Sequence, residues 1–110
     1  PKPKKFIEKS GNNSSIVSLS FSSGGAFLVA GSTDCLIRVY YFDNEDPIRV
    51  AEIDSHSEIV DSILFSNNSS RFLSGSKDGS AKIWWYESQR WKHYILDTSK
   101  TLQKPGLEEL

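Results

Sequence analysis

The sequence repeats itself at a spacing of 44 residues, and no other feature restricts the possible folds as strongly. Residues 16–40 align with residues 60–84 without an insertion or a deletion. A unit of this length cannot bury a core alone, so successive units must stack. The identical pairs are Ser18 with Ser62, Phe21 with Phe65, Ser22 with Ser66, Gly31 with Gly75, Ser32 with Ser76, and Asp34 with Asp78. A period of about 40–45 residues is typical of the four-stranded blades of a β-propeller.

Short runs rich in apolar and β-branched residues, separated by polar turns, predict four strands in each repeat. We expect strands at residues 16–21, 27–31, 36–41 and 49–53, and again at 60–65, 71–75, 81–86 and 91–96. A tight turn is expected between the second and third strands, at Thr33-Asp34-Cys35 in the first repeat and at Lys77-Asp78-Gly79 in the second, where Asp-Gly supplies the positive φ that a two-residue hairpin turn favours. No segment has a convincing helical period, so the sequence predicts an all-β chain.

The repeats divide the chain into four parts. Residues 10–53 and 54–97 each form one repeat, residues 1–9 supply the outer strand of a preceding blade, and residues 98–110 form a tail or linker. The sequence contains no Met and starts at Pro1, so we expect a piece of a longer protein. The predicted fold is a fragment of a propeller with about two four-stranded antiparallel blades.

Composition argues against several classes of function. The net charge is −1, from 13 basic and 14 acidic side chains, so no overall field attracts nucleic acid or an anionic membrane. Cys35 is the single cysteine, and with two histidines the chain cannot build a Cys/His-rich zinc site. No apolar run approaches the roughly 20 residues of a membrane helix. We therefore expect no cofactor, no metal and no membrane insertion.

The second repeat carries a dense set of motif residues. They are Ser55-His56, Phe65-Ser66, Lys82-Ile83-Trp84 and the run Leu73-Ser74-Gly75-Ser76-Lys77-Asp78-Gly79. Together they resemble a WD repeat, whose fold is a propeller blade and whose function is protein interaction. The first repeat keeps Phe21-Ser22, Gly31-Ser32 and Asp34. It has Asn12 in place of the motif His and Tyr40-Tyr41 in place of Trp-Asp, and the second repeat has Trp84-Trp85.

Several segments of this sequence also resemble the propeller blades of one particular family of WD-repeat proteins, the bromodomain and WD-repeat family, which includes the PH-interacting protein. The segments that carry this resemblance are residues 21–28, 31–34, 37–40, 55–56, 60–63 and 71–79. The resemblance implies a nuclear, chromatin-associated regulator of transcription and cell shape that serves as a substrate receptor of cullin-4 ubiquitin ligases. Its implied partners are histone or chromatin proteins, a ubiquitin-ligase adaptor and the remaining blades of the same propeller. The Asp-x-Arg associated with adaptor docking follows neither Trp84 nor Tyr40.

The WD-repeat resemblance implies a buried structural tetrad in the second repeat, formed by His56, Ser74, Asp78 and Trp84. Asp78 would accept a hydrogen bond from His56, and Ser74 would connect His56 to the indole N–H of Trp84. The same Ser, His and Asp could instead form a hydrolase triad, but no oxyanion hole is evident and we expect no enzyme. The first repeat has Asn12, Ala30, Asp34 and Tyr40 at the equivalent positions, so it cannot form the complete tetrad.

Aromatic residues raise an alternative function, a nucleic-acid-binding β module. Trp84-Trp85-Tyr86, Trp91 and Tyr94 could stack on bases. Alternation along a strand sends Trp84 and Trp85 to opposite faces, however, which favours packing between blades. Three weaker hypotheses are a nuclear-import signal at residues 1–5, a reactive thiol at Cys35 and a cation site in the acidic run 43–46.

Propellers bind partners through their loops, because the strands are committed to one another. The WD-repeat resemblance places the partner surface beside the tetrad. The candidate partner-facing residues are Thr33, Lys77, Ser57, Glu58, Asn13 and Ser14.

Overall fold

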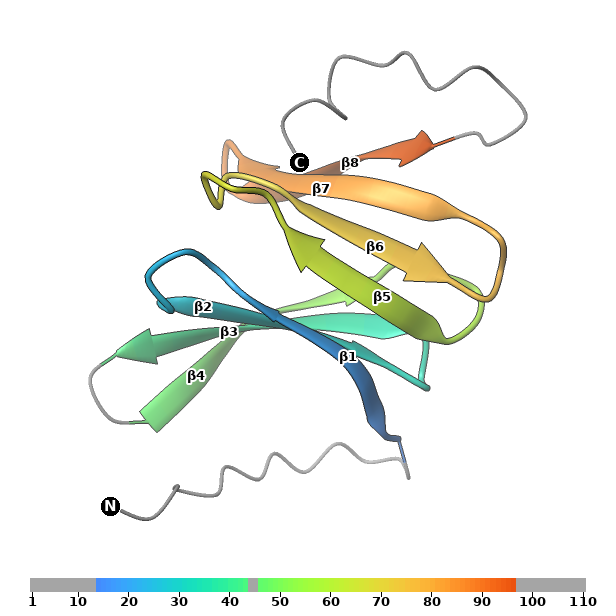
Figure 1. Cartoon of the computed structure of the whole chain (residues 1–110), viewed down its shortest axis with the longest axis horizontal. Coiled ribbons are helices and arrows are strands. Elements are labelled where there is room, and N and C mark those ends of the chain that lie inside the picture. The colour runs from blue at the N-terminus through green and yellow to red at the C-terminus, as the bar shows by residue number, and fades with distance from the viewer. Residues whose placement is uncertain (1–13, 44–45, 97–110) are drawn as a thin grey trace.

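The structure is a computed structural model that describes residues 14–43 and 46–96 of the chain, and it contains two antiparallel four-stranded sheets (Figure 1). The first sheet consists of β1 (Ile16–Phe21), β2 (Phe27–Ser32), β3 (Leu36–Asp43) and β4 (Asp46–Asp54). The second consists of β5 (Val60–Phe65), β6 (Phe72–Ser76), β7 (Ala81–Glu87) and β8 (Arg90–Leu96). Each sheet is a simple meander in which neighbours in sequence pair in space. The predicted all-β fold with two four-stranded blades is confirmed.

The fourth strand of the first sheet is longer than the sequence suggested. It begins at Asp46 rather than residue 49, and Pro47 pairs with Phe42 of β3. Proline is tolerated here because β4 lies at the edge of its sheet, where a missing N–H breaks no ladder. The strand predicted at residues 4–8 and the tail from residue 98 lie outside the described residues. No helix among residues 14–43 and 46–96 is long and apolar enough to cross a bilayer.

The tight turn predicted at Lys77-Asp78-Gly79 is present between β6 and β7. The backbone N–H of Gly79 donates to the Ser76 carbonyl at 3.1 Å, and Gly79 has a positive φ of 88° whereas Asp78 does not. In this loop a turn is followed by one left-handed residue, rather than by the two left-handed residues of a two-residue hairpin turn. A two-residue turn joins β7 to β8, where Ser88 and Gln89 have φ values of 54° and 64°. Ser and Gln adopt a positive φ less readily than Gly, Asn or Asp, so this pair is not a hairpin signal in the sequence.

The two sheets stack face to face, and their first strands, β1 and β5, lie side by side (Figure 1). Apolar side chains from both sheets form one core between them. Its buried members are Val29, Ile37, Val39, Val60, Ile63, Phe72 and Trp84. The 44-residue repeat therefore folds as two stacked units with a shared core, as the length of one unit requires.

The two sheets approach each other closely at Gly31 in β2. A Cβ built there would lie 2.7 Å from the Val60 Cγ1 and 2.7 Å from the Val60 carbonyl oxygen. Ser18 and Ser20 of β1 bond to the backbone of β5: the Ser18 hydroxyl donates to the Val60 carbonyl at 2.9 Å, and the Ser20 hydroxyl accepts from the Phe65 N–H at 3.1 Å. Glycine is needed at position 31 because the backbone of β5 occupies the space of a side chain.

Candidate functional site

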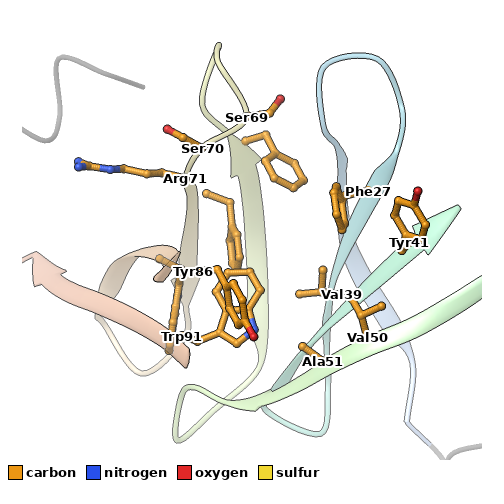
Figure 2. Close-up of a pocket in the computed structure, with 13 residues that line it drawn as sticks. Phe27, Val39, Tyr41, Val50, Ala51, Ser69, Ser70, Arg71, Tyr86 and Trp91 are labelled. Carbon is orange, nitrogen blue, oxygen red and sulfur yellow. The ribbon is translucent and has the colours of Figure 1, made fainter. Parts of the chain in front are cut away.

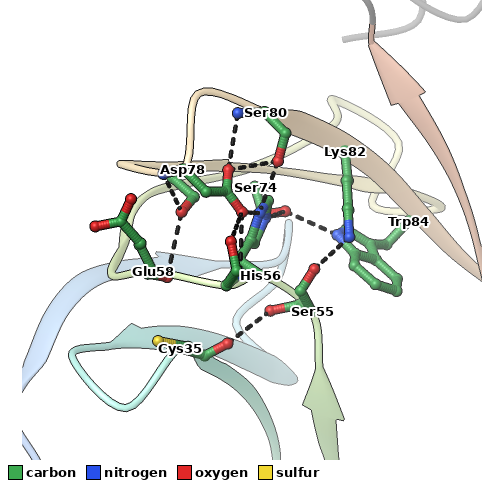
Figure 3. A network of polar contacts seen from close by, with 11 residues as sticks. Cys35, Ser55, His56, Glu58, Ser74, Asp78, Ser80, Lys82 and Trp84 are labelled. Carbon is green, nitrogen blue, oxygen red and sulfur yellow. Dashed lines mark hydrogen bonds and ion pairs between the residues drawn. The ribbon is translucent and has the colours of Figure 1, made fainter.

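A polar network in the second sheet joins four side chains that lie far apart in the sequence (Figure 3). Asp78 Oδ2 lies 3.1 Å from His56 Nδ1, and His56 Nε2 lies 2.8 Å from the Ser74 hydroxyl. The indole N–H of Trp84 donates to the same hydroxyl at 2.8 Å. The structure thus brings together the connection between β4 and β5, the middle of β6, the turn after it and β7.

The hydrogen-bond partners of His56 indicate which of its ring nitrogens carries the proton. The Trp84 indole can only donate, so the Ser74 hydroxyl accepts from it and donates its own proton to His56 Nε2. His56 Nδ1 then carries the proton and donates to Asp78. His56 is therefore neutral in this network, held as one tautomer between an acceptor and a donor.

Asp78 collects further hydrogen bonds that the sequence analysis missed. Its carboxylate accepts from the Ser80 N–H at 2.8 Å, the Ser80 hydroxyl at 2.6 Å and the Ser57 N–H at 3.0 Å. Burial raises the pKa of Asp78, but the hydrogen bonds from Ser80, Ser57 and His56 outweigh it and hold this pKa well below its usual range. Ser80 is thus a fifth member of the network, and Ser57 is anchored by it.

The contacts of Asp78, His56 and Ser74 follow the order of a hydrolase triad. Ser74, however, is 0% exposed, and its hydroxyl contacts both His56 and the Trp84 indole. A nucleophile must reach a substrate, and this oxygen is enclosed by its own sheet. The arrangement therefore holds the loop at His56 against the turn at Asp78.

In the first sheet, the turn at Asp34 between β2 and β3 is the equivalent of the turn at Asp78, and a cluster of ion pairs holds it. Asp34 accepts from the Leu36 N–H at 3.2 Å and from Arg38 NH2 at 2.5 Å. Arg38 also donates through Nε to Glu52 of β4 at 2.8 Å, and its side chain is 8% exposed. Arg49 donates to the same Glu52 oxygen at 3.0 Å. A buried arginine thus ties the turn at Asp34 to β4 of the same sheet, whereas His56 ties the turn at Asp78 to the loop before β5.

The network reaches across the interface between the sheets through Ser55. Its hydroxyl donates to the Cys35 carbonyl of the first sheet at 3.2 Å, and its own carbonyl accepts from the Lys82 ammonium group (Figure 3). Cys35 has a φ of 72° and occupies the position that Gly79 has in the second sheet. The structure places this residue in a strained turn that anchors the next blade.

The candidate partner-facing residues that the structure describes lie at the same end of the molecule as the network, although not all are available for contact. The side chains of Lys77 and Glu58 are exposed. Thr33 accepts from the Ser15 N–H at 2.9 Å, and the exposed Ser57 donates its N–H to Asp78. Ser14 is half-buried, and Asn13 lies outside the described residues. Lys77 and Glu58 are therefore the best placed of the six for contact with a partner.

A groove of about 530 Å³ opens between the sheets at the opposite end (Figure 2). Its lining includes Phe27, Tyr41 and Val50 from the first sheet and Tyr86 and Trp91 from the second. The sequence analysis missed this groove, because its walls come from facing sheets whose register only the structure reveals.

The aromatic run of the second repeat is divided between two faces of its sheet. Trp84, Tyr86 and Trp91 face the first sheet, around the core and the groove. Trp85 turns to the opposite face, where its ring lies 4.8 Å from that of Tyr94. These residues therefore do not form one continuous stacking platform, and packing accounts for their arrangement.

The burial of His56 predicts a dependence of stability on pH. Burial lowers the pKa of His56, and Asp78 opposes this effect without reversing it. The unfolded chain then binds a proton near the ordinary pKa of about 6.5 while the folded chain does not. The free energy of unfolding is therefore expected to be highest above this pH and to decrease as the pH falls towards about 5.

Denaturant unfolding at a series of pH values measures this effect. Burial also lowers the pKa of His93, with help from Lys82 and His56, so both histidines contribute with the same sign. His56→Asn and His93→Asn should each flatten the profile in part. A stability that rises on acidification would show that His56 is charged and paired with Asp78.

Two stacked antiparallel meanders, with their first strands side by side and their turns fixed by buried polar groups, define a pair of β-propeller blades. Proteins of this class are interaction scaffolds, since strands are used for packing and loops for contact.

Comparisons with known proteins identify the family. The profile "WD domain, G-beta repeat" matches residues 3–41 and 47–84, so the chain belongs to the WD-repeat family. A U3 snoRNP-associated protein-like relative from Arabidopsis thaliana, EMB2271, is 33% identical over 73 residues, which are 66% of this chain and 15% of the relative. The crystal structure of Saccharomyces cerevisiae Sqt1 has the same fold, with a TM-score of 0.67 at 14% identity, over 76% of this chain and 23% of Sqt1. The chain thus spans a minor part of each.

Proposed function

We propose that this chain supplies two blades of a protein-interaction propeller and binds its partner at the end that carries the His56–Asp78 network. The observation that supports this proposal is that Lys77 and Glu58 are exposed and lie beside the loop at His56 and the turn at Asp78. Hydrogen bonds from His56 and from the Ser57 N–H to Asp78 hold this loop and this turn together. Rigid loops lose little conformational entropy on binding, which favours recognition at this end. In a longer chain, the remaining blades of the same propeller would extend this surface.

We extend the proposal to a nuclear protein of chromatin, involved in transcription and cell shape, on the resemblance to the bromodomain and WD-repeat family. Its partner would be a histone or another chromatin protein. A role as a cullin-4 substrate receptor would depend on blades outside this chain, since neither repeat has the Asp-x-Arg that follows the third strand in adaptor-binding blades. We propose no catalytic role, because Ser74 is enclosed.

Charge reversals at the two exposed positions test the partner surface. With a histone H3–H4 tetramer as the probe, Glu58→Lys is expected to weaken binding about five-fold, because one rim charge contributes about 1 kcal/mol. Lys77→Glu should act in the opposite direction or not at all. Both variants should keep the wild-type thermal midpoint, since both side chains are exposed. Fluorescence anisotropy measures the affinities of the wild type and the two variants. Identical affinities for the three would show that the histone does not bind at Lys77 and Glu58.

The alternative, a nucleic-acid-binding module, has one supporting observation: the Arabidopsis relative is described as associated with a ribonucleoprotein. A labelled single-stranded RNA in the same assay separates the two functions. Phosphate contacts release counterions and make the affinity fall steeply with salt, whereas protein recognition depends on salt only weakly. Tight RNA binding with a steep salt dependence would favour the alternative.

A further inference from the structure

The groove at the end opposite the polar network has aromatic side chains on both of its walls (Figure 2). Phe27 and Tyr41 belong to the wall of the first sheet, with ring centroids 5.2 Å apart. Tyr86 and Trp91 belong to the wall of the second sheet, and their centroids are also 5.2 Å apart. Phe27, Tyr41 and Tyr86 are exposed, so this aromatic surface is open to solvent and is not used up in the core.

The size of the groove suits a few side chains of an extended segment. Its volume of about 530 Å³ lies within the range of roughly 300–1,000 Å³ that is common for sites that enclose small ligands. Val39, Val50 and Ala51 complete the wall of the first sheet and are apolar. A bound side chain would therefore lie between one wall of aliphatic and aromatic groups and a second wall of aromatic rings.

The positive charges nearest to these walls are directed away from the groove. Arg71 is the one charged residue in the lining that the structure describes, and its guanidinium lies over the Trp85 ring on the opposite face of the second sheet, 5.6 Å from the centroid (Figure 2). Lys92 is the cross-strand partner of Trp85, so it belongs to that opposite face as well. A cation that enters the groove therefore meets aromatic rings and is not repelled from within it.

Acidic residues end the hairpin that carries Tyr41. Asp43 of β3 pairs with Asp46 of β4, two positions beyond the pairing of Tyr41 with Ile48. At the corresponding end of the second wall, Glu87 pairs with Arg90, and their charges offset each other. The charge at this end of the groove is therefore negative, and it complements a cationic ligand.

We propose that the groove binds an extended basic segment of a partner protein, with a lysine or arginine side chain of that segment between Tyr41 and Tyr86. The aliphatic stem of such a side chain packs on apolar surface, and its charged end is attracted by the faces of aromatic rings. A purely apolar side chain would gain nothing from the acidic end of the hairpin. The groove lies at the opposite end from Lys77 and Glu58, so its failure would leave the partner surface proposed above untouched.

Fluorescence anisotropy with a labelled peptide of alternating lysine and alanine tests the proposal on the 110-residue chain. Two matched peptides carry glutamine or glutamate in place of every lysine. The wild-type chain is expected to bind the lysine peptide about ten-fold more tightly than the glutamine peptide, and the glutamate peptide most weakly. Equal affinities for the three peptides would overturn the proposal, and so would tighter binding of the glutamine or the glutamate peptide.

Two tyrosines of the second sheet form a matched pair for locating the peptide. Tyr86 is 59% exposed and lines the groove, whereas Tyr94 is 57% exposed and lies beside Trp85 on the opposite face. Tyr86→Ala is expected to weaken binding of the lysine peptide about ten-fold, and Tyr94→Ala should bind it as the wild type does. Equal losses in the two variants, or no loss in Tyr86→Ala, would show that the peptide does not bind in the groove.

Charge changes on the first wall test the sign of the ligand. Asp43→Asn combined with Asp46→Asn is expected to weaken binding of the lysine peptide about five-fold at low salt and less at high salt, because exposed charges are screened. Val50→Lys places a like charge in the groove from an exposed position, and it should abolish binding even if Tyr86→Ala does not fold. Glu58→Lys, at the other end of the molecule, should keep the wild-type affinity for this peptide. An affinity unchanged by Val50→Lys would overturn the proposal.

Discussion

Replacing Asp78 with alanine is expected to lower the free energy of unfolding by about 3 kcal/mol. The carboxylate accepts hydrogen bonds from His56, Ser80 and the Ser57 N–H, so its loss removes their shared acceptor and leaves His56 Nδ1 with the Ser80 hydroxyl alone, at 3.0 Å. The imidazole of His56 is fully enclosed and cannot turn to water instead. Urea unfolding followed by tryptophan fluorescence measures the change, because Trp84 belongs to the same network.

A double-mutant cycle tests whether these residues act as one unit. His56→Ala should cost about 3 kcal/mol, through its hydrogen bonds and the cavity it leaves, and Ser74→Ala about 1 kcal/mol. Because His56 and Asp78 share one interaction, the double variant should cost less than the two single changes together, by about 1–2 kcal/mol. Asp61→Ala is the matched control, since this carboxylate is exposed on the same sheet. Strictly additive costs, or an equal cost at Asp61, would contradict the network.

Asp34, the equivalent of Asp78 in the first sheet, is not suitable as a mild control for these substitutions. It caps its own turn, as its position predicts, but it also holds the buried Arg38 at 2.5 Å. Removing it would leave that guanidinium with Glu52. Asp34→Ala is therefore a second test of a buried ion pair, in the other sheet.

Replacing Gly31 with alanine is expected to lower the free energy of unfolding by about 3 kcal/mol or more, because the new methyl group has no space. Its Cβ would lie 2.3 Å from the Ser18 hydroxyl oxygen and 2.7 Å from the Val60 carbonyl oxygen. The hydroxyl can rotate away, but the carbonyl belongs to the backbone of β5. Relief therefore requires the two sheets to separate, which would open the core around Val29 and Phe72.

Gly75 provides the matched control within the same chain. An added Cβ would lie 3.2 Å from the Cβ of Ser62, on an exposed strand that can yield by a few tenths of an ångström. Gly75→Ala is therefore expected to cost less than about 1 kcal/mol. Equal costs for Gly31→Ala and Gly75→Ala would show that the two sheets do not stack as described.

Sequence periodicity was enough to predict the strands, because alternation and turn residues act locally. The start of β4 was missed because Pro47 and the acidic residues before it are typical of loops, and only the position of β4 at the edge makes Pro47 acceptable. The turn at Ser88-Gln89 was missed because its residues do not favour a positive φ.

The residues of the polar network were predicted by resemblance to the WD repeat, and the structure shows why sequence reasoning stopped there. Ser80 and Arg38 are ordinary surface residue types, and nothing local indicates that either is held by a carboxylate. Arg38 meets Glu52 because Arg38 and Glu52 are paired neighbours on β3 and β4. The aromatic groove depends likewise on the stacking of two sheets, which no local pattern specifies.

The polar contacts between β1 and β5 use small hydroxyl side chains on one strand and main-chain groups on the other. Main-chain groups are the same whatever residue carries them. These polar contacts depend on no particular side chain of the neighbouring blade beyond a small residue at the crossing point, and the shared core requires only that the facing side chains be apolar. Duplicated repeats could therefore diverge in sequence and still stack, as these two have done with a histidine-centred network in one blade and an arginine-centred cluster in the other. Such tolerance allows a gene to gain, lose or exchange whole blades while each one acquires its own surface.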